Sequence, residues 1–218
     1  MRIHLKLSKN NTSVDFHYIS KITGTVHKWL KRNELHDSLS LYSFSFFKGG
    51  IKKDNYLQFP TGTSFFFSSY DDIVIKNIIK GIQIDPSVAY GMEVNEVIIQ
   101  ENPDFSNKEL FYLGSPVLIK RNINGKDKHY IYTDNEAGML MVETIKRKLK
   151  QAGLCDETLS IEFDKTYSNP KTKLIHYNNV GNKASMCPVI IKGNPETKLF
   201  AWNVGVGNST GIGFGSLI

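Results

Sequence analysis

Residues 205–215 read Gly-Val-Gly-Asn-Ser-Thr-Gly-Ile-Gly-Phe-Gly, which places five glycines in eleven positions. Glycine lets backbone N–H groups approach phosphate oxygens without interference from a Cβ, and it adopts the positive φ angles of an anion-binding nest. This segment, called the tail below, therefore predicts a loop suited to the backbone of a nucleic acid. The expected contacts are Gly205, Gly207, Asn208, Ser209, Gly211 and Gly213.

Other glycine-rich motifs do not fit the tail. A Walker loop needs Gly-Lys-Ser/Thr, and a dinucleotide fingerprint needs Gly-x-Gly-x-x-Gly after a strand, whereas the tail follows an expected helix with a longer spacing. The stretch from Gly207 to Gly211 spells the elbow of a serine hydrolase, but no histidine follows Ser209. A tight, bulged hairpin without a ligand remains the structural alternative.

Length and composition indicate a folded, two-domain protein. With 218 residues and 40% hydrophobic residues, we expect a domain at 1–100, a linker at 101–109 that contains Pro103, and a second domain at 110–218. The first residues lack the apolar core of a secretory signal, and no run approaches 18 apolar residues. The two cysteines, Cys155 and Cys187, form no Cys-x-x-Cys pair. A cytoplasmic location is therefore expected.

The net charge of +6 favours a polyanionic partner. The basic residues are scattered, and no basic helix carries an opposing Trp/Phe/Leu face, which argues against a membrane surface. Nucleic acid is the better candidate, although the charge alone would also be explained by solubility.

The first half alternates strands and helices. Arg2 to Leu7 has the period of a half-buried strand, and apolar residues recur at helical spacing over about 16–31. Asp71 or Asp72 is expected to cap a second helix that reaches about Ile82. The remaining expected strands are 39–47, turned by Gly49-Gly50 into 56–59, then 64–68 and 94–100.

The second half repeats this mixture. Thr133 and Glu136 spell a capping box for a helix that reaches about Gln151, with a core stripe that includes Met141 and Ile145. Pro195 is expected in the first turn of a short helix, 195–203. The expected strands are 111–121, 130–132, 159–163, 173–177 and 189–191. Two consecutive units with few, short helices suggest an α+β fold of tandem ferredoxin-like (RRM-like) domains.

The tail also carries a family resemblance. Its pattern of Gly-hydrophobic-Gly, four residues, then hydrophobic-Gly-Phe-Gly resembles the signature of the Cas6 family of CRISPR-associated endoribonucleases, which belongs to the RAMP superfamily. The strand Arg2–Leu7, the stretch Leu-Gly-Ser-Pro-Val-Leu-Ile at 113–119 and the total length agree with it. The resemblance implies tandem ferredoxin-like domains and a CRISPR repeat RNA, hairpin or linear, as substrate. It also implies metal-independent cleavage to 2′,3′-cyclic phosphate and 5′-OH ends.

Histidines are the expected catalytic residues, because imidazole exchanges protons near neutral pH. In the resembled family a loop histidine is usually catalytic, often with a Tyr or His partner in the first helix, and by that resemblance His36 and His27 fill these places. Without the resemblance, either one could equally cap a helix end or be solvated. No histidine belongs to a ligand cluster, so no metal or other cofactor is expected. The other four are expected to be structural: His4, His17, His129 and His176.

Cations near these histidines are the expected partners of the RNA phosphates. A lysine that some family members place after the loop histidine is missing from Asp37-Ser-Leu-Ser-Leu-Tyr42. Charge for the transition state is instead expected from Lys28, Lys31, Lys48 or Lys52, or from the histidine pair alone. Lys28, Lys31 and Arg32 are expected to bind RNA. The polar side of the second-domain helix should carry further cations, either solvated or touching RNA: Lys146, Arg147, Lys148 and Lys150.

Two alternatives remain for the function. The missing lysine favours a non-catalytic subunit that binds repeat RNA within a CRISPR ribonucleoprotein complex, and a housekeeping RNA-binding protein is a further possibility. RNA is the expected partner in each case. A homodimer or association with an effector complex is compatible with the sequence.

Overall fold

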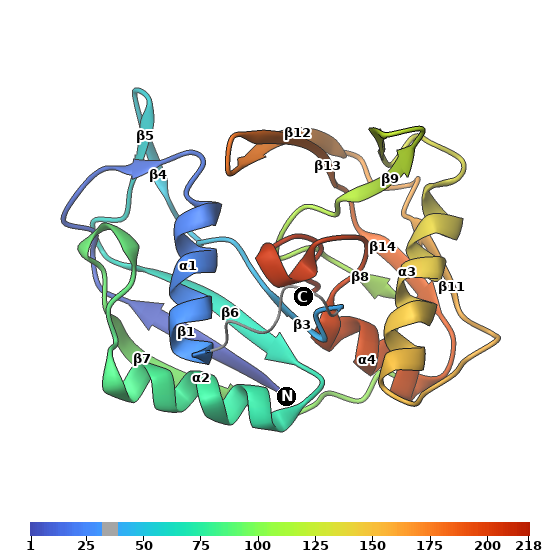
Figure 1. Cartoon of the computed structure of the whole chain (residues 1–218), viewed down its shortest axis with the longest axis horizontal. Coiled ribbons are helices and arrows are strands. Elements are labelled where there is room, and N and C mark those ends of the chain that lie inside the picture. Colours follow the sequence, from blue (N-terminus) through green and yellow to red (C-terminus); the bar gives the residue numbers. More distant parts are fainter. Residues whose placement is uncertain (32–38) are drawn as a thin grey trace.

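The computed structural model describes residues 1–31 and 39–218, which form two α+β units side by side (Figure 1). Within these ranges, no helix has the length and apolarity needed to cross a membrane. The first unit comprises, in chain order, β1 (Arg2–Leu7), β2 (Val14–Asp15), α1 (Ile19–Leu30), β3 (Tyr42–Phe44), β4 (Ile51–Lys53), β5 (Tyr56–Gln58), β6 (Thr63–Ser69), α2 (Asp72–Ile84), the 3₁₀ turn η1 (Ala89–Gly91) and β7 (Val94–Gln100).

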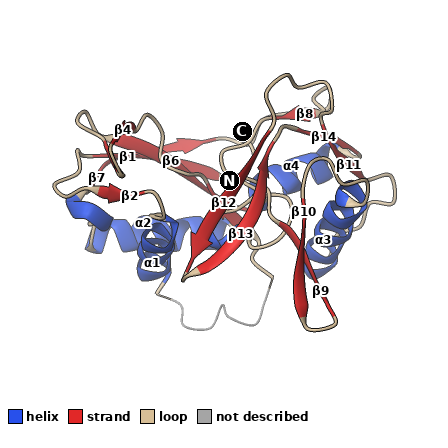
Figure 2. Ribbon diagram, turned by 90° about the horizontal axis from the view of Figure 1, so that it is seen from above, coloured by secondary structure: helices blue, strands red, loops and turns tan. Residues whose placement is uncertain are grey.

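The main sheet of the first unit has the antiparallel strand order β3-β6-β1-β7, with α1 and α2 against one face (Figure 2). Strand β1 is central because its alternate residues Ile3, Leu5 and Leu7 are apolar and pack into one core with the buried faces of both helices. One helix follows β1 and the other follows β6, so the unit has the ferredoxin-like arrangement that the sequence predicts.

Most predicted elements of the first unit are present, and β1 and β7 have the predicted bounds. The side chain of Asp71 caps α2 by accepting a hydrogen bond from the Ile73 backbone N–H at 2.8 Å. Helix α1 begins only at Ile19, and it ends where Lys31 adopts left-handed backbone with φ 52°.

The turn predicted at Gly49-Gly50 is wrong. Strand β5 pairs with β4 through a turn at Asp54, which has φ 45°, whereas β3 pairs with β6. The strand predicted at 39–47 shortens to β3 because the pairing with β6 becomes irregular beyond Phe44. The Phe66 N–H donates to the Ser45 hydroxyl at 3.0 Å, and the Phe46 N–H donates to the Gly114 carbonyl oxygen at 3.1 Å.

The second unit has its own sheet, in the order β11-β14-β8. A bridge between Leu113 and Leu217 adds the C-terminal residues beside β8, which completes a second ferredoxin-like order. The elements of this unit are β8 (Leu110–Phe111), β9 (Ile119–Ile123), β10 (Lys126–Tyr130), α3 (Ala137–Gln151), β11 (Ser160–Phe163), β12 (Lys171–Tyr177), β13 (Val180–Met186), β14 (Val189–Lys192), α4 (Pro195–Val204) and the 3₁₀ turn η2 (Thr210–Ile212).

Several predictions for the second unit need correction. The capping box is wrong, because Glu136 makes no side-chain cap and the Asp134 carboxylate accepts a hydrogen bond from the Ile131 N–H at 2.7 Å instead. The strand predicted at 111–121 divides into β8 and β9. Strand β13, which pairs with β12 in a long hairpin, was not predicted because its sequence, Val-Gly-Asn-Lys-Ala-Ser-Met, has few of the β-branched and aromatic residues typical of strands. Phe105, within the predicted linker, is buried in the second core.

Arg2 joins the two units. Its guanidinium carbon lies 3.8 Å from the ring centroid of Phe66 in β6 and 3.4 Å from that of Trp202 in α4. The side chain is only 2% exposed and donates hydrogen bonds to the Ser68 hydroxyl and to the carbonyl oxygens of Trp202 and Leu217, at 2.6, 3.0 and 2.8 Å. One buried cation therefore connects α4 to the sheet of the first unit, in addition to the hydrogen bond of 3.0 Å from the Ser43 hydroxyl to the Asn203 carbonyl oxygen.

Candidate nucleic-acid interface

The tail folds back on itself between the two units. The Val206 N–H donates to the Gly215 carbonyl oxygen at 2.8 Å, which closes the loop. Two further backbone hydrogen bonds tie it to the segment before β9: Gly215 N–H donates to the Pro116 oxygen at 2.8 Å, and Asn208 N–H to the Leu118 oxygen at 2.7 Å. The tail is thus an integral part of the fold.

The glycines of the tail are buried against the chain's own atoms. A Cβ on Gly213, which has φ 89°, would lie 2.5 Å from Ile19 Cδ1 of α1 and 2.7 Å from a Phe44 ring carbon of β3. A Cβ on Gly207 would meet the Leu118 carbonyl oxygen at 2.5 Å. A Cβ on Gly205 would meet the Gly215 carbonyl oxygen at 2.8 Å, and a Cβ on Gly211 would meet Ser40 Cβ at 2.7 Å. Close packing within the protein therefore already requires these glycines.

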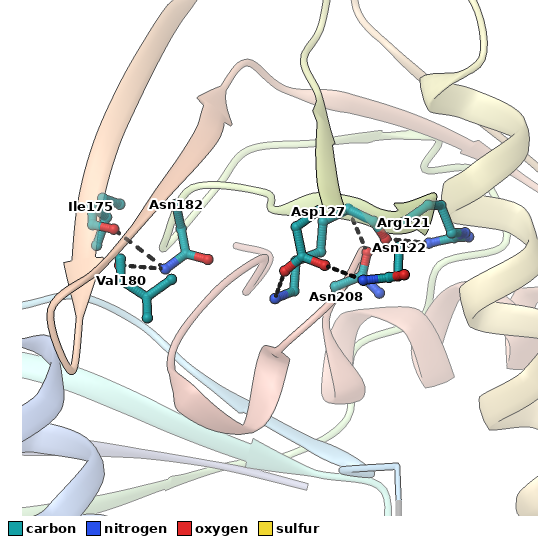
Figure 3. Close-up of polar contacts among 8 residues, drawn as sticks. Arg121, Asn122, Asp127, Ile175, Val180, Asn182 and Asn208 are labelled. Atoms are coloured by element: carbon teal, nitrogen blue, oxygen red, sulfur yellow. Dashed lines mark hydrogen bonds and ion pairs between the residues drawn. The ribbon is translucent and has the colours of Figure 1, made fainter. Parts of the chain in front are cut away.

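The part of the tail that reaches solvent is short. Asn208, Ser209 and Ile212 are half-buried, whereas the residues around them are buried. The Asn208 side-chain oxygen accepts hydrogen bonds from the Lys120 backbone N–H at 2.9 Å and from the Arg121 guanidinium at 3.3 Å (Figure 3). Arg121 is itself held by an ion pair of 3.0 Å with Glu143 of α3. Asn208 is thus fixed beside the cationic hairpin β9–β10.

One stripe of α1 faces the second unit. Ser20, Gly24 and His27 recur at spacings of four and three residues, which places them on one side of the helix, and Lys31 follows as the C-cap. At the start of the stripe, the Asn178 N–H at the tip of the β12–β13 hairpin donates to the Ser20 hydroxyl at 3.3 Å. Gly24 is exposed, and a Cβ there would have no neighbour within 4 Å.

The predicted catalytic and RNA-binding residues of the first unit are not all described. His27 is half-buried on the α1 stripe, whereas His36 and Arg32 lie outside the described residues. Lys31 is exposed. The Lys28 ammonium donates to Asp85 Oδ2 at 2.8 Å and to the backbone and hydroxyl oxygens of Ser87, which ties α1 to the end of α2. These contacts lower the pKa of Asp85.

Two of the histidines expected to be structural form a contact that the sequence did not reveal. His17, just before α1, and His176 of β12 lie edge to face with ring centroids 4.5 Å apart, so they join the two units. His4 hydrogen-bonds to Gln100 of the neighbouring strand β7 at 2.7 Å. The fourth, His129, lies in β10.

The prediction that Lys148 lies on the polar side of its helix is wrong. Lys148 is 3% exposed, and its ammonium donates to the Val204 carbonyl oxygen at 2.9 Å and to the Thr210 hydroxyl at 2.7 Å. Its spacing of seven from Met141 and three from Ile145 puts it on the core face of α3. Burial lowers the pKa of Lys148 to about 7. Lys148 therefore links α3 to the tail.

Replacing Gly213 by alanine should destabilise the protein by about 2 to 4 kcal/mol, because the new Cβ meets both positive-φ strain and the side chains of α1 and β3. Gly125, in the β9–β10 turn, is a matched control with φ 81° and no neighbour within 4 Å of its Cβ position. Gly125→Ala should cost only the backbone strain, about 1 to 2 kcal/mol. Urea unfolding measures both, and equal losses would contradict the packing role of Gly213.

The buried lysine predicts a pH-dependent stability. Because the folded state lowers the pKa of Lys148 to about 7, the unfolded chain binds an extra proton between about pH 7 and the ordinary lysine pKa of about 10.4. Its contribution to the free energy of unfolding should therefore rise with pH in this window, by up to about 1.4 kcal/mol per pH unit, and stay level below it. The difference in unfolding free energy between wild type and Lys148→Met, measured from pH 6 to 10, tests this. A difference independent of pH would show that the ammonium is not desolvated.

Comparison with known proteins identifies the family. The model of the C-terminal region of CRISPR associated protein Cas6 matches residues 100–217. Among curated proteins no significant match is found. A solved structure from work on a Cas6-related gene of Pyrococcus furiosus has a TM-score of 0.86 at 19% identity, covering 100% of this chain and 97% of its own.

Two more solved structures share the fold. One is described as CRISPR associated protein Cas6, with a TM-score of 0.84, 18% identity and coverage of 100% and 98%. The other is described as a RAMP protein binding different RNA substrates, with a TM-score of 0.84, 20% identity and coverage of 100% and 99%. With the family model matching more than half of its residues, the chain belongs to the Cas6 family of CRISPR-associated proteins.

Proposed function

We propose that this protein is a metal-independent endoribonuclease that cuts CRISPR repeat RNA and leaves 2′,3′-cyclic phosphate and 5′-OH ends. The observation that carries the proposal is the Cas6 family match over residues 100–217. Structures that share the fold support RNA as the ligand, since one is described as binding different RNA substrates and another, with a TM-score of 0.65 and 12% identity, as a Cas6 product complex.

Two histidines serve as the proton-transfer pair in the proposed mechanism, His27 on α1 and His36. The 2′-OH of the RNA attacks the adjacent phosphorus, one histidine takes its proton, and the other protonates the 5′-oxygen as the phosphorus–oxygen bond breaks. The position of His27 on the α1 stripe supports this role, because an RNA strand between α1 and the second unit would pass beside it. Lys31 and Arg32 supply positive charge for the phosphorane.

The tail contributes to RNA binding through its half-exposed residues. Asn208 and Ser209 contact the RNA backbone, next to the cations of β9–β10. Gly205, Gly207, Gly211 and Gly213 give the tail its shape by allowing close packing with the rest of the chain. Lys28 contributes less to RNA binding than the sequence suggests, because its ammonium already donates to three oxygen atoms of Asp85 and Ser87.

A second candidate function is a binder of repeat RNA that does not cut. The observation that favours it is the scarcity of catalytic cations near the histidines: no lysine lies between His36 and Lys48, and Lys28 is engaged by Asp85 and Ser87. The two candidates differ in one measurable property, the cleavage of RNA.

Incubation of the protein with the repeat RNA of its own genome should produce specific cleavage that persists in EDTA. His36→Ala and His27→Ala should each slow single-turnover cleavage by about 10²- to 10⁴-fold, because each removes one proton-transfer group, while RNA affinity is retained. His4→Ala, in β1 on the sheet face opposite α1 and α2, is the control and should cleave like wild type.

Three results would overturn parts of this account. Cleavage that disappears in EDTA and returns with Mg²⁺ would contradict the metal-independent mechanism. Binding without cleavage by wild type would establish the second candidate. Full activity of His27→Ala would remove His27 from the mechanism and leave the endoribonuclease itself intact.

A further inference from the structure

We propose that a pocket between the segment before α1 and strand β12 binds one unpaired base of the RNA together with its phosphate. The inference rests on the proposed function, and it names a contact that neither the tail nor the two histidines provide. Phe16, His17, Tyr18 and Phe46 line the pocket from the first unit, and Lys173 and Leu174 from the second. The pocket is therefore formed only when the units are assembled.

The walls of this pocket suit a flat aromatic ring. Its volume is about 360 Å³, within the range of ligand-sized cavities. Phe16 and Leu174 line the pocket from the two units, and 44% and 63% of their surfaces are exposed. The pocket therefore leaves apolar surface open to solvent on both sides. The edge-to-face contact with His176 fixes the ring of His17. A nucleobase stacked on Phe16 would cover this exposed apolar surface.

Cations at the pocket supply the partner for a phosphate. Lys173 lines the pocket, and the ammonium of Lys52 lies 5.8 Å from the ring centroid of Phe16. Within the part of the chain that the structure describes, neither lysine has a carboxylate partner within 4 Å, in contrast to Lys120 of β9 and Lys146 of α3. Aromatic rings combined with unneutralised cations are the chemistry by which proteins hold single-stranded nucleic acid.

The pocket lies away from the proposed reaction. It adjoins Ile19 at the start of α1, and His27 is eight residues further along, which corresponds to about 12 Å along the helix axis. A base in the pocket therefore belongs to a different nucleotide from the one that is cut. The role of the pocket is to position the RNA strand. Loss of the pocket should therefore weaken the binding of every repeat sequence more than it slows the cleavage step.

Binding of a repeat RNA made with 2′-O-methyl nucleotides, which cannot attack through the 2′ position, tests the pocket by fluorescence anisotropy. Phe16→Ala should raise Kd by about 5- to 150-fold, the equivalent of one stacked base, whereas Phe16→Tyr should bind like wild type. Lys173→Ala should raise Kd and flatten its salt dependence. Tyr112→Ala and Lys76→Ala, which remove an exposed aromatic ring and an exposed lysine elsewhere, are the matched controls and should leave Kd unchanged.

Abasic substitution of the RNA, one nucleotide at a time, locates the base. One abasic position should weaken binding to wild type but add no further loss in Phe16→Ala, because both changes remove the same contact. If wild type binds the RNA and Phe16→Ala binds equally well, the pocket inference is overturned and the proposed function stands. If wild type does not bind any repeat RNA, the proposed function fails, and the pocket inference with it.

Discussion

The guanidinium of Arg2 lies between the rings of Phe66 and Trp202, and two of its three hydrogen bonds end on carbonyl oxygens of the second unit. Burial lowers the pKa of Arg2, but a guanidinium remains a cation at neutral pH, so the site must satisfy its charge. It does so with two ring faces and three oxygen acceptors. Because α4 and Leu217 supply most of these partners, the first unit needs the end of the chain to complete its own structure.

The tail makes the candidate interface depend on contacts between the two units as well. It begins at the end of α4, its glycines pack against α1 and β3, and Lys148 holds Thr210 from the side of α3. Thr210 in turn donates to the Tyr42 carbonyl oxygen of β3 at 3.1 Å. The α1 stripe, the tail and the pocket at Phe16 are therefore placed by contacts between the units. An RNA bound along these surfaces meets a framework whose geometry is already fixed.

Local patterns of the sequence predicted much of the fold and less of the site. The alternation in β1 and the cap at Asp71 depend on neighbouring residues, which is why both were predicted correctly. The sequence also contained the information needed to predict the burial of Lys148, since its spacing from Met141 and Ile145 places it on the core face of α3. Its charge led to the prediction of a solvent-facing position instead. The contact of Arg2 with Trp202 spans 200 residues, and the pocket joins two units, so no local pattern could reveal either. His36 and Arg32 lie outside the described residues, and their roles stay predictions.

Arg2 should make the two units one cooperative structure, and native-state hydrogen exchange tests this most directly. Amides of β1 in the first unit and of β14 in the second should open with the same free energy. Arg2→Met should lower both values together, by about 3 kcal/mol or more, because it strands buried acceptors, whereas Lys6→Met on the exposed face of the same strand should change neither by more than about 1 kcal/mol. A loss confined to β1, with β14 unchanged, would contradict the account.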